Sequence, residues 1–187
     1  MSPMRSAIPV SVATERIFVG LGANLGDATA SVLQALRDLA TLPDTQVVAA
    51  SALYRSAPVA AAGPDYINAV AELRTALSPE GLLRALQAVE HAHGRERPCP
   101  NAPRTLDLDL LLFGSRQVAT PALVLPHPRL HLRAFVLQPL AELAPELVLP
   151  GLGPLVPWLA RCADQLVERI DTSSTGRSDF SRDGTAG

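Results

Sequence analysis

The segment Arg104-Thr105-Leu106-Asp107-Leu108-Asp109-Leu110-Leu111-Leu112-Phe113 is the part of this chain that says most about its fold and its chemistry. Successive side chains of a β-strand point to opposite faces, so Asp107 and Asp109 would share one face and the leucines at even positions from 106 to 112 the other. Two carboxylates about 7 Å apart on a half-buried strand repel each other, so a cation is expected between them. Mg²⁺ is the first candidate, because carboxylates and substrate phosphates commonly hold it together. The competing interpretation is a pair of solvent-facing aspartates at a strand end.

Composition limits the classes of protein that the chain can belong to. It has 187 residues, 48% of them hydrophobic, and no apolar run approaches the roughly 18 residues that cross a bilayer. The formal net charge of −2 argues against broad nucleic-acid binding, which needs a clustered basic surface. All 16 basic residues are arginine, so any phosphate site must use guanidinium groups. Two cysteines support neither a disulfide scaffold nor a zinc site, and we expect a cytoplasmic protein.

The chain is expected to form one domain with two loose ends. Residues 1–15 have no apolar core followed by a cleavage site, so they predict a flexible extension and no secretory signal. Residues 171–187 are rich in Ser, Thr, Asp and Gly and predict a disordered tail. The single domain would therefore span residues 16–170.

The order of predicted elements indicates an α+β fold. Strands are expected over residues 17–21, about 46–54, 66–75 and the carboxylate segment, with helices after Asp27 and after Ser78-Pro79-Glu80. This order predicts a ferredoxin-like βαββαβ core, in which an antiparallel sheet carries both helices on one face and leaves the other for a site.

Other segments are expected outside that core. Residues 57–63 and 95–103 predict loops that could close over a substrate. Downstream we expect a hairpin arm over residues 116–120, a short helix over 130–137 and an amphipathic helix over 152–170.

Several further residues are candidates for a site, each with an ordinary alternative. Arg95, Arg97 and Arg104 would surround the carboxylate strand and suit a polyphosphate, although a solvated charged loop has the same composition. Pro126 and Pro128 restrict where the imidazole of His127 can point, although a rigid turn needs the same residues.

Arg133 and Phe135 could offer a phosphate contact and a stacking surface, and a surface arginine with a core phenylalanine is the alternative. Tyr66 and Asn68 would face one way on a strand and suit a flat heterocycle, although a satisfied buried Asn is equally ordinary. Glu90, at the margin of a helix stripe, could reach the site or face water.

Together these residues resemble the 6-hydroxymethyl-7,8-dihydropterin pyrophosphokinase family of folate biosynthesis. The resemblance covers residues 17–149 and rests on six blocks in order: residues 22–27 (Gly-Ala-Asn-Leu-Gly-Asp), 51–56 (Ser-Ala-Leu-Tyr-Arg-Ser), 64–68 (Pro-Asp-Tyr-Ile-Asn), 94–97 (Gly-Arg-Glu-Arg), 103–109 (Pro-Arg-Thr-Leu-Asp-Leu-Asp), and 126–128 (Pro-His-Pro) with 133–135 (Arg-Ala-Phe). It implies the ferredoxin-like core and transfer of the terminal diphosphate of ATP to the pterin hydroxymethyl group, with release of AMP.

The resemblance also implies roles for individual residues. Asp107 and Asp109 would bind two Mg²⁺ ions that bridge the ATP phosphates. The residues implied for the triphosphate and its transfer are Arg95, Arg97, Arg104, His127 and Arg133, with Gln87 and Glu90 near the nucleotide. Those implied for the pterin are Ser56, Val59, Tyr66, Asn68 and Phe135.

Two departures from the family pattern stand out. Many relatives have Arg-Trp-Gly where this chain has Pro100-Asn101-Ala102, so a stacking tryptophan and an arginine are missing and loop closure could differ. Gly22-Ala23-Asn24 replaces a common Gly-Ser-Asn, which leaves the turn plausible.

Two other functions compete with this one. A Mg²⁺-dependent phosphohydrolase could use the same aspartates without a pterin. A ferredoxin-like RNA-binding module would need exposed aromatic residues on the sheet, which 4% aromatic content disfavours. The expected partners are therefore ATP and the pterin, with no nucleic acid and no membrane, and a monomer is the default expectation.

Overall fold

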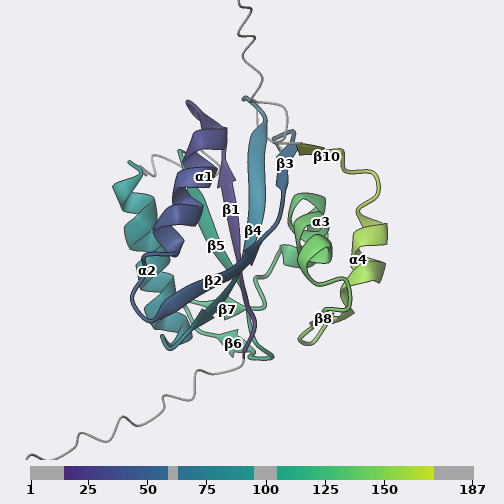
Figure 1. Ribbon diagram of the computed structural model, residues 1–187. Coiled ribbons are helices and arrows are strands. Elements are labelled where there is room, and N and C mark those ends of the chain that lie inside the picture. The colour runs from purple at the N-terminus through teal and green to yellow at the C-terminus, as the bar shows by residue number, and fades with distance from the viewer. Residues whose placement is uncertain (1–14, 59–62, 95–104, 171–187) are drawn as a thin grey trace, which may run out of the picture.

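A computed structural model describes residues 15–58, 63–94 and 105–170 (Figure 1). Outside the described residues lie the predicted N-terminal extension apart from Glu15, the predicted C-terminal tail, and all of the predicted second loop over 95–103. Residues 59–62 of the first loop lie outside them as well.

The described chain alternates strands and helices. The strands are β1 (Ile17–Ala23), β2 (Thr45–Ala50), β3 (Leu53–Ser56), β4 (Tyr66–Thr75), β5 (Asp107–Phe113), β6 (Val118–Ala119), β7 (Val124–Leu125), β8 (Val148–Leu149), β9 (Gly153–Pro154) and β10 (Val167–Ile170). The helices are α1 (Ala28–Leu39), α2 (Pro79–Ala92), α3 (Ala134–Leu143) and α4 (Leu155–Arg161), with a short 3₁₀ helix over Leu130–Leu132.

Six strands form one antiparallel sheet, which confirms the prediction of a mixed α and β protein built on such a sheet. The strand order is β10-β3-β4-β1-β5, and β2 pairs with β4 beside β3. Strands β6 and β7 form one separate two-stranded hairpin, and β8 and β9 form another.

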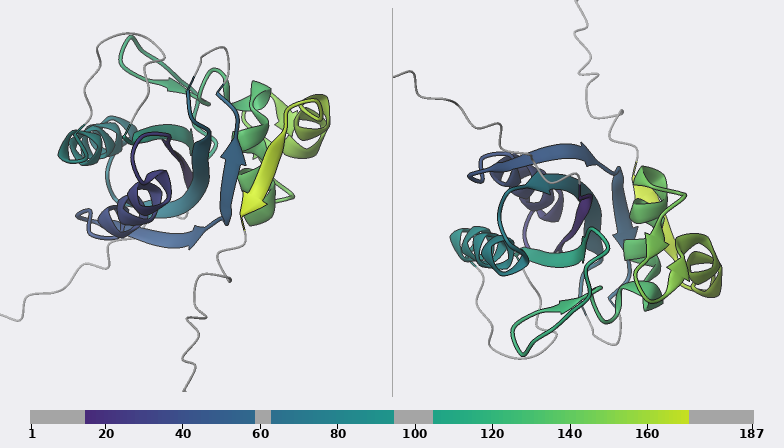
Figure 2. Two further views of the ribbon diagram at one scale, coloured as in Figure 1. Left: turned by 90° about the horizontal axis from the view of Figure 1, so that it is seen from above. Right: turned by 90° about the horizontal axis from the view of Figure 1, so that it is seen from below.

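Helices α1 and α2 pack on one side of the sheet, called here the helix face. Side chains of β1 and β4 at odd positions, such as Val19, Leu21 and Leu73, form a buried cluster with the apolar stripes of these two helices. Both helices begin as their sequences predict: the side chain of Asp27 accepts a hydrogen bond from the amide of Ala30, and that of Ser78 from the amide of Gly81. The two views of Figure 2 show both helices on this side.

The opposite side of the sheet, called here the site face, is covered only in part. Phe18, Val70 and Leu111 pack against α3, α4 and the segments around them in a second buried cluster. Helices α3 and α4 lie on the side away from α1 and α2 in Figure 2. The predicted free face is thus partly wrong: it carries a second apolar layer, and the polar residues considered below lie where β1 and β3 end and β4 and β5 begin.

Two predicted elements are divided in the structure. The strand expected over 46–54 is two strands, because the chain turns at Ser51, whose amide and hydroxyl both bond to Val70 of β4. The helix expected over 130–137 is the 3₁₀ turn followed by α3, since Arg133 is extended between them. Helix α3 then continues past Pro139, because that residue and Leu140 are buried against the sheet.

The prediction of an amphipathic helix over 152–170 is wrong. Only α4 is helical there, and Val167–Ile170 instead forms β10 on the open edge of β3. Pairing with an existing strand edge satisfies the backbone of these residues, which outweighs a weak helical pattern.

A bulge corrects the expected alternation of the carboxylate strand. Leu108 and Leu110 point to the helix face as predicted, but the pairing of β5 with β1 shifts between Val19 and Phe18. Leu111 and Leu112 consequently both join the cluster on the site face.

Candidate functional site

Asp107 and Asp109 lie on the site face at the start of β5, as the period-two argument predicts. Both are half-buried, and they stand opposite Gly22 and Gly20 of β1. The same two glycines stand opposite Asn68 and Val70 of β4 on their other side.

The floor of the site between β4 and β5 is therefore bare backbone at Gly22, whereas the side chain of Leu111 lies over Gly20. A Cβ atom at Gly22 would meet the Asn68 Oδ1 at 3.4 Å and nothing else within 4 Å. Because neighbouring strands are about 4.8 Å apart, roughly 9–10 Å separates the strand of Asn68 from the strand of Asp107. This feature was not predicted from the sequence, although Gly20-Leu21-Gly22 carries its signal: two glycines on one face of an otherwise apolar strand.

His127 and Arg133 converge on the second carboxylate. An Arg133 Nη lies 3.9 Å from the Asp109 Oδ2, which is close enough for an ion pair, and the His127 Nε2 lies at the same distance from that oxygen; both distances are longer than a hydrogen bond. The amide of His127 donates to the Leu111 carbonyl at 2.9 Å, so the backbone of β5 itself sets the position of this histidine. The structure thus brings together three residues that are separated by up to 24 positions in the sequence.

The imidazole of His127 is held mainly in its neutral form. Burial lowers its pKa, the positive charges of Arg133 and Arg129 lower it further, and the charge of Asp109 opposes them. The amide of Arg129 donates to the His127 Nδ1 at 3.3 Å. A neutral ring that accepts at Nδ1 carries its proton on Nε2, which is the atom that faces Asp109.

A second polar group lies across the glycine floor, on β3 and β4. Asn68 is 4% exposed, and its Nδ2 donates to the Ser56 Oγ at 3.0 Å and to the Tyr54 carbonyl at 3.4 Å. Tyr66 pairs with Ser56 at the ends of these strands and is half-buried on the same face. The Asn68 amide is oriented by these bonds, with its oxygen toward Gly22.

Phe135 lies in the first turn of α3. The guanidinium carbon of Arg133 is 5.5 Å from the centre of the Phe135 ring, a cation–π distance. The arginine and the aromatic ring that the sequence paired are therefore neighbours, in the part of α3 nearest the acidic strand.

The two helix residues expected near a nucleotide differ in their surroundings. Gln87 is exposed on α2. Glu90 is 2% exposed, and its Oε1 accepts a hydrogen bond from the amide of Leu108 at 2.7 Å. Val59, Arg95, Arg97 and Arg104 lie outside the described residues.

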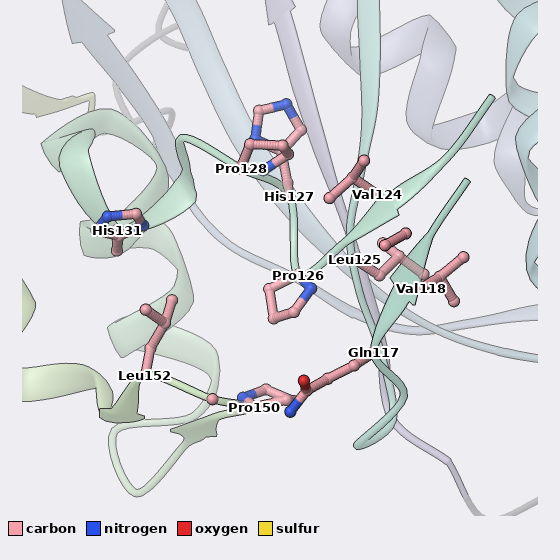
Figure 3. A pocket seen from close by; sticks show the side chains of 12 residues that line it. Gln117, Val118, Val124, Leu125, Pro126, His127, Pro128, His131, Pro150 and Leu152 are labelled. Carbon is pink, nitrogen blue, oxygen red and sulfur yellow. The ribbon is translucent and has the colours of Figure 1, made fainter. Parts of the chain in front are cut away.

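A concavity of about 360 Å³ lies on the other side of the segment that carries His127. Its walls include Leu125 of the β6–β7 hairpin, His131 and Leu152, as Figure 3 shows, and its lining is mostly apolar. His127 lines it, so this concavity adjoins the polar site, but neither aspartate of β5 lines it.

Two features are absent from the described residues. These residues contain no group of three or more His, Cys, Asp and Glu side chains that could hold a metal ion. No helix in the described ranges is long and apolar enough to cross a bilayer.

Comparison with known proteins identifies the chain. Residues 18–145 match the family model described as 7,8-dihydro-6-hydroxymethylpterin-pyrophosphokinase. This match covers most of the described fold and places the chain in a class of pyrophosphate-transferring enzymes. The chain belongs to the 7,8-dihydro-6-hydroxymethylpterin-pyrophosphokinase family.

Individual relatives agree with the family model. A protein of Pseudomonas aeruginosa named 2-amino-4-hydroxy-6-hydroxymethyldihydropteridine pyrophosphokinase is 46% identical over 157 residues, which cover 83% of this chain and 97% of that protein. Proteins of the same name from Synechocystis and Haemophilus influenzae are 41% and 37% identical, over 83% and 82% of this chain and 76% and 97% of their own lengths.

Solved structures with a similar fold are larger proteins. The HPPK-DHPS in complex with substrates superposes with a TM-score of 0.64 at 11% identity, over 80% of this chain and 43% of that one. Plasmodium falciparum HPPK-DHPS with pteroate gives 0.64 at 12% identity, over 79% and 42%. This chain spans less than half of those chains, and at such identities the likeness concerns the fold alone.

Proposed function

We propose that the protein transfers the diphosphate of ATP to 6-hydroxymethyl-7,8-dihydropterin, giving the pterin diphosphate and AMP, as a step of folate biosynthesis. One observation carries the proposal: in a chain of this family, Asp107 and Asp109 share the polar end of the site face with His127 and Arg133, across a glycine floor from Asn68. Anionic and cationic groups at one end, and the amide of Asn68 beside uncovered backbone at Gly22 at the other, suit two substrates bound side by side.

The donor set fits Mg²⁺ that is held jointly with a substrate. Two half-buried carboxylates on one strand face are too few for a closed protein cage, but Mg²⁺ is usually bound by one or two carboxylates together with phosphates and water. We expect Asp107 and Asp109 to hold two such ions, which when bound neutralise charge on the ATP phosphates. The side chains then need only to position the reacting groups.

His127 and Arg133 would act on the phosphate chain. Arg133 can form two parallel hydrogen bonds to a phosphate, and the Nε2–H of a neutral His127 can donate one more. Arg95, Arg97 and Arg104 are proposed for the triphosphate, and the exposed Gln87 for the nucleotide, from the family pattern.

The pterin is placed over the glycine floor. The Asn68 Oδ1 can accept from the ring nitrogens, and Tyr66 and Phe135 supply apolar surfaces for a flat heterocycle. Ser56 and Val59 are proposed to border the same pocket.

Fold and organisation complete the proposal. The strand order β5-β1-β4, with β2 and β3 on the far side of β4 and both α1 and α2 on one face, supports a ferredoxin-like core with the β6–β7 hairpin, α3 and α4 added. We propose a single domain over residues 16–170, acting as a monomer in the cytoplasm, where ATP is available.

Nucleotide product analysis tests the reaction. The protein is incubated with Mg-ATP, with and without 6-hydroxymethyl-7,8-dihydropterin, and AMP, ADP and phosphate are separated. AMP formed only with the pterin, and without phosphate, is the expected result. Phosphate released without the pterin would indicate the hydrolase instead.

A further inference from the structure

Glu90 is a buried acidic residue whose position in the site needs explanation. It is 2% exposed near the C-terminal end of α2, on the same side of the helix as Leu86, which is fully buried. A buried carboxylate is costly unless it accepts hydrogen bonds, and the Glu90 Oε1 accepts one from the Leu108 amide at 2.7 Å, a length typical of charge-assisted bonds.

The donor of this bond lies between the two aspartates. Leu108 is the residue between Asp107 and Asp109, and within the described sheet β5 is an edge strand whose partner is β1. Edge strands present unpaired amides on their outer side, and Glu90 satisfies the one at Leu108. On the same outer edge of β5, three residues after Leu108, the Leu111 carbonyl accepts a hydrogen bond from the amide of His127.

We infer that Glu90 is a positioning residue that fixes the backbone of β5 between Asp107 and Asp109, and with it the spacing and direction of the two carboxylates. The inference rests on the proposed function, in which those carboxylates hold the metal ions of the ATP complex. Carboxylate ligands must be held within about 0.5 Å of the working geometry, and a single hydrogen bond to the amide between them restrains both at once.

This role differs from the direct nucleotide contact that the family pattern suggests for the same residue. A side chain that contacts the nucleotide must turn an oxygen toward bulk-accessible space. The Glu90 Oε1 instead lies at the outer edge of β5, bonded to the Leu108 amide, and the residue as a whole is only 2% exposed.

Two substitutions at this position separate the possibilities. Glu90→Gln keeps an oxygen that can accept from the Leu108 amide but loses the charge, and Glu90→Ala removes the acceptor. Glu80→Ala is the matched control, because Glu80 is an exposed glutamate on the same helix. Each protein is measured by amide hydrogen exchange at Leu108 without substrates, by thermal unfolding, and by kcat and KM for both substrates over a range of Mg²⁺ concentrations.

We expect Leu108 exchange to accelerate in Glu90→Ala and to stay close to wild type in Glu90→Gln. In Glu90→Ala, kcat should fall by about 10–100-fold and the Mg²⁺ concentration needed for half activity should rise, with an unchanged KM for the pterin. Glu90→Gln should recover most of kcat, and Glu80→Ala should match wild type.

Two outcomes would overturn the inference. If Gln and Ala both raise the KM for ATP and leave Leu108 exchange unchanged, Glu90 contacts the nucleotide. If Ala lowers only the melting temperature and the folded enzyme keeps its kcat and Mg²⁺ dependence, the bond is structural alone. Failure of the proposed function is recognised separately, because wild-type protein would then make no pterin-dependent AMP while the exchange result could still hold.

Discussion

The two faces of the sheet use the same strands for different purposes. On the helix face, Val19, Leu21, Leu108 and Leu110 are buried in one continuous apolar cluster. On the site face, the same strands are apolar only where α3 and α4 cover them, and they carry aspartates, glycines and Asn68 elsewhere. Because side chains alternate, one strand can stabilise the fold with every second residue and supply chemistry with those between.

The largest effect is expected from the acidic residues of β5. Asp107→Ala or Asp109→Ala should lower kcat by about 10³-fold or more, since metal ions contribute several kcal/mol to charge stabilisation and each 1.4 kcal/mol is tenfold. The melting temperature should stay near wild type, because neither side chain belongs to an apolar cluster. Steady-state kinetics and thermal unfolding measure the two quantities. If both variants unfold, the aspartates have a structural role, and the two faces do not differ in function as proposed.

The neighbouring leucine on the helix face should behave in the opposite way. Leu110→Ala leaves a cavity in the first cluster and is expected to lower the free energy of unfolding by about 2–5 kcal/mol. The kcat per folded molecule should change far less than in Asp109→Ala. Urea denaturation followed by fluorescence or circular dichroism gives the stability, and activity is measured where the variant is fully folded. A Leu110→Ala variant of normal stability but without activity would contradict the assignment of stability to the helix face and of catalysis to the site face.

A smaller effect tests the glycine floor. Gly22→Ala adds a Cβ next to the Asn68 Oδ1, where the pterin is proposed to lie. One extra carbon in a fitted pocket costs about 10-fold or more in binding, so the KM for the pterin should rise while the KM for ATP changes little. Stability should be equal to wild type or slightly higher, because alanine suits a strand better than glycine. An unchanged pterin KM would mean that the heterocycle does not lie over β1.

The smallest effect concerns the boundary between the covered and open parts of the site face. The Tyr54 hydroxyl donates to the Glu142 Oε2 at 2.7 Å and ties β3 to α3. Burial, and then this bond to a carboxylate, raise the pKa of Tyr54 to about 12. The protonated phenol is thus favoured in the folded protein, and its contribution is complete below pH 10 and is lost as the pH rises toward 12.

Tyr54→Phe should therefore cost about 1–2 kcal/mol at neutral pH and reduce the loss of stability between pH 10 and 12. Denaturation at several pH values, compared with wild type, provides the measurement. Identical alkaline profiles for the two proteins would show that this contact does not hold α3 in place.

Short sequence signals were sufficient to predict several of the helix and strand boundaries of the core. Ser78-Pro79 placed the start of α2, Gly94 marks its end with a φ of +74°, and the strand predicted over 66–75 is β4 to the residue. These features depend on capping, left-handed glycine conformations and strict alternation, which act within a few residues. The turn at Ser51 and the C-terminal strand β10 were not predicted, because both depend on pairing with strands that are distant in the sequence.

In the candidate site, too, the sequence predicted the residues with a local signal but not the features that depend on contacts between distant segments. Asp107, Asp109, His127 and Arg133 were found from spacing and family resemblance, and the structure brings them together. The bond from the Leu108 amide to Glu90 and the uncovered backbone at Gly22 were not predicted, because both depend on which strand lies beside which in the sheet.

The sequence by itself determined the family, the reaction class to test, the core elements and the face on which the two aspartates lie, because these follow from residue types and short periodicities. Only the tertiary structure decided what surrounds that face: α3 covers one end of it, the backbone of β5 fixes His127, and α2 sends Glu90 to the edge between the carboxylates. The physical reason is that the alternation of side chains along a β-strand determines which face each side chain is on. The partners that a side chain meets on that face depend on contacts between segments far apart in the chain.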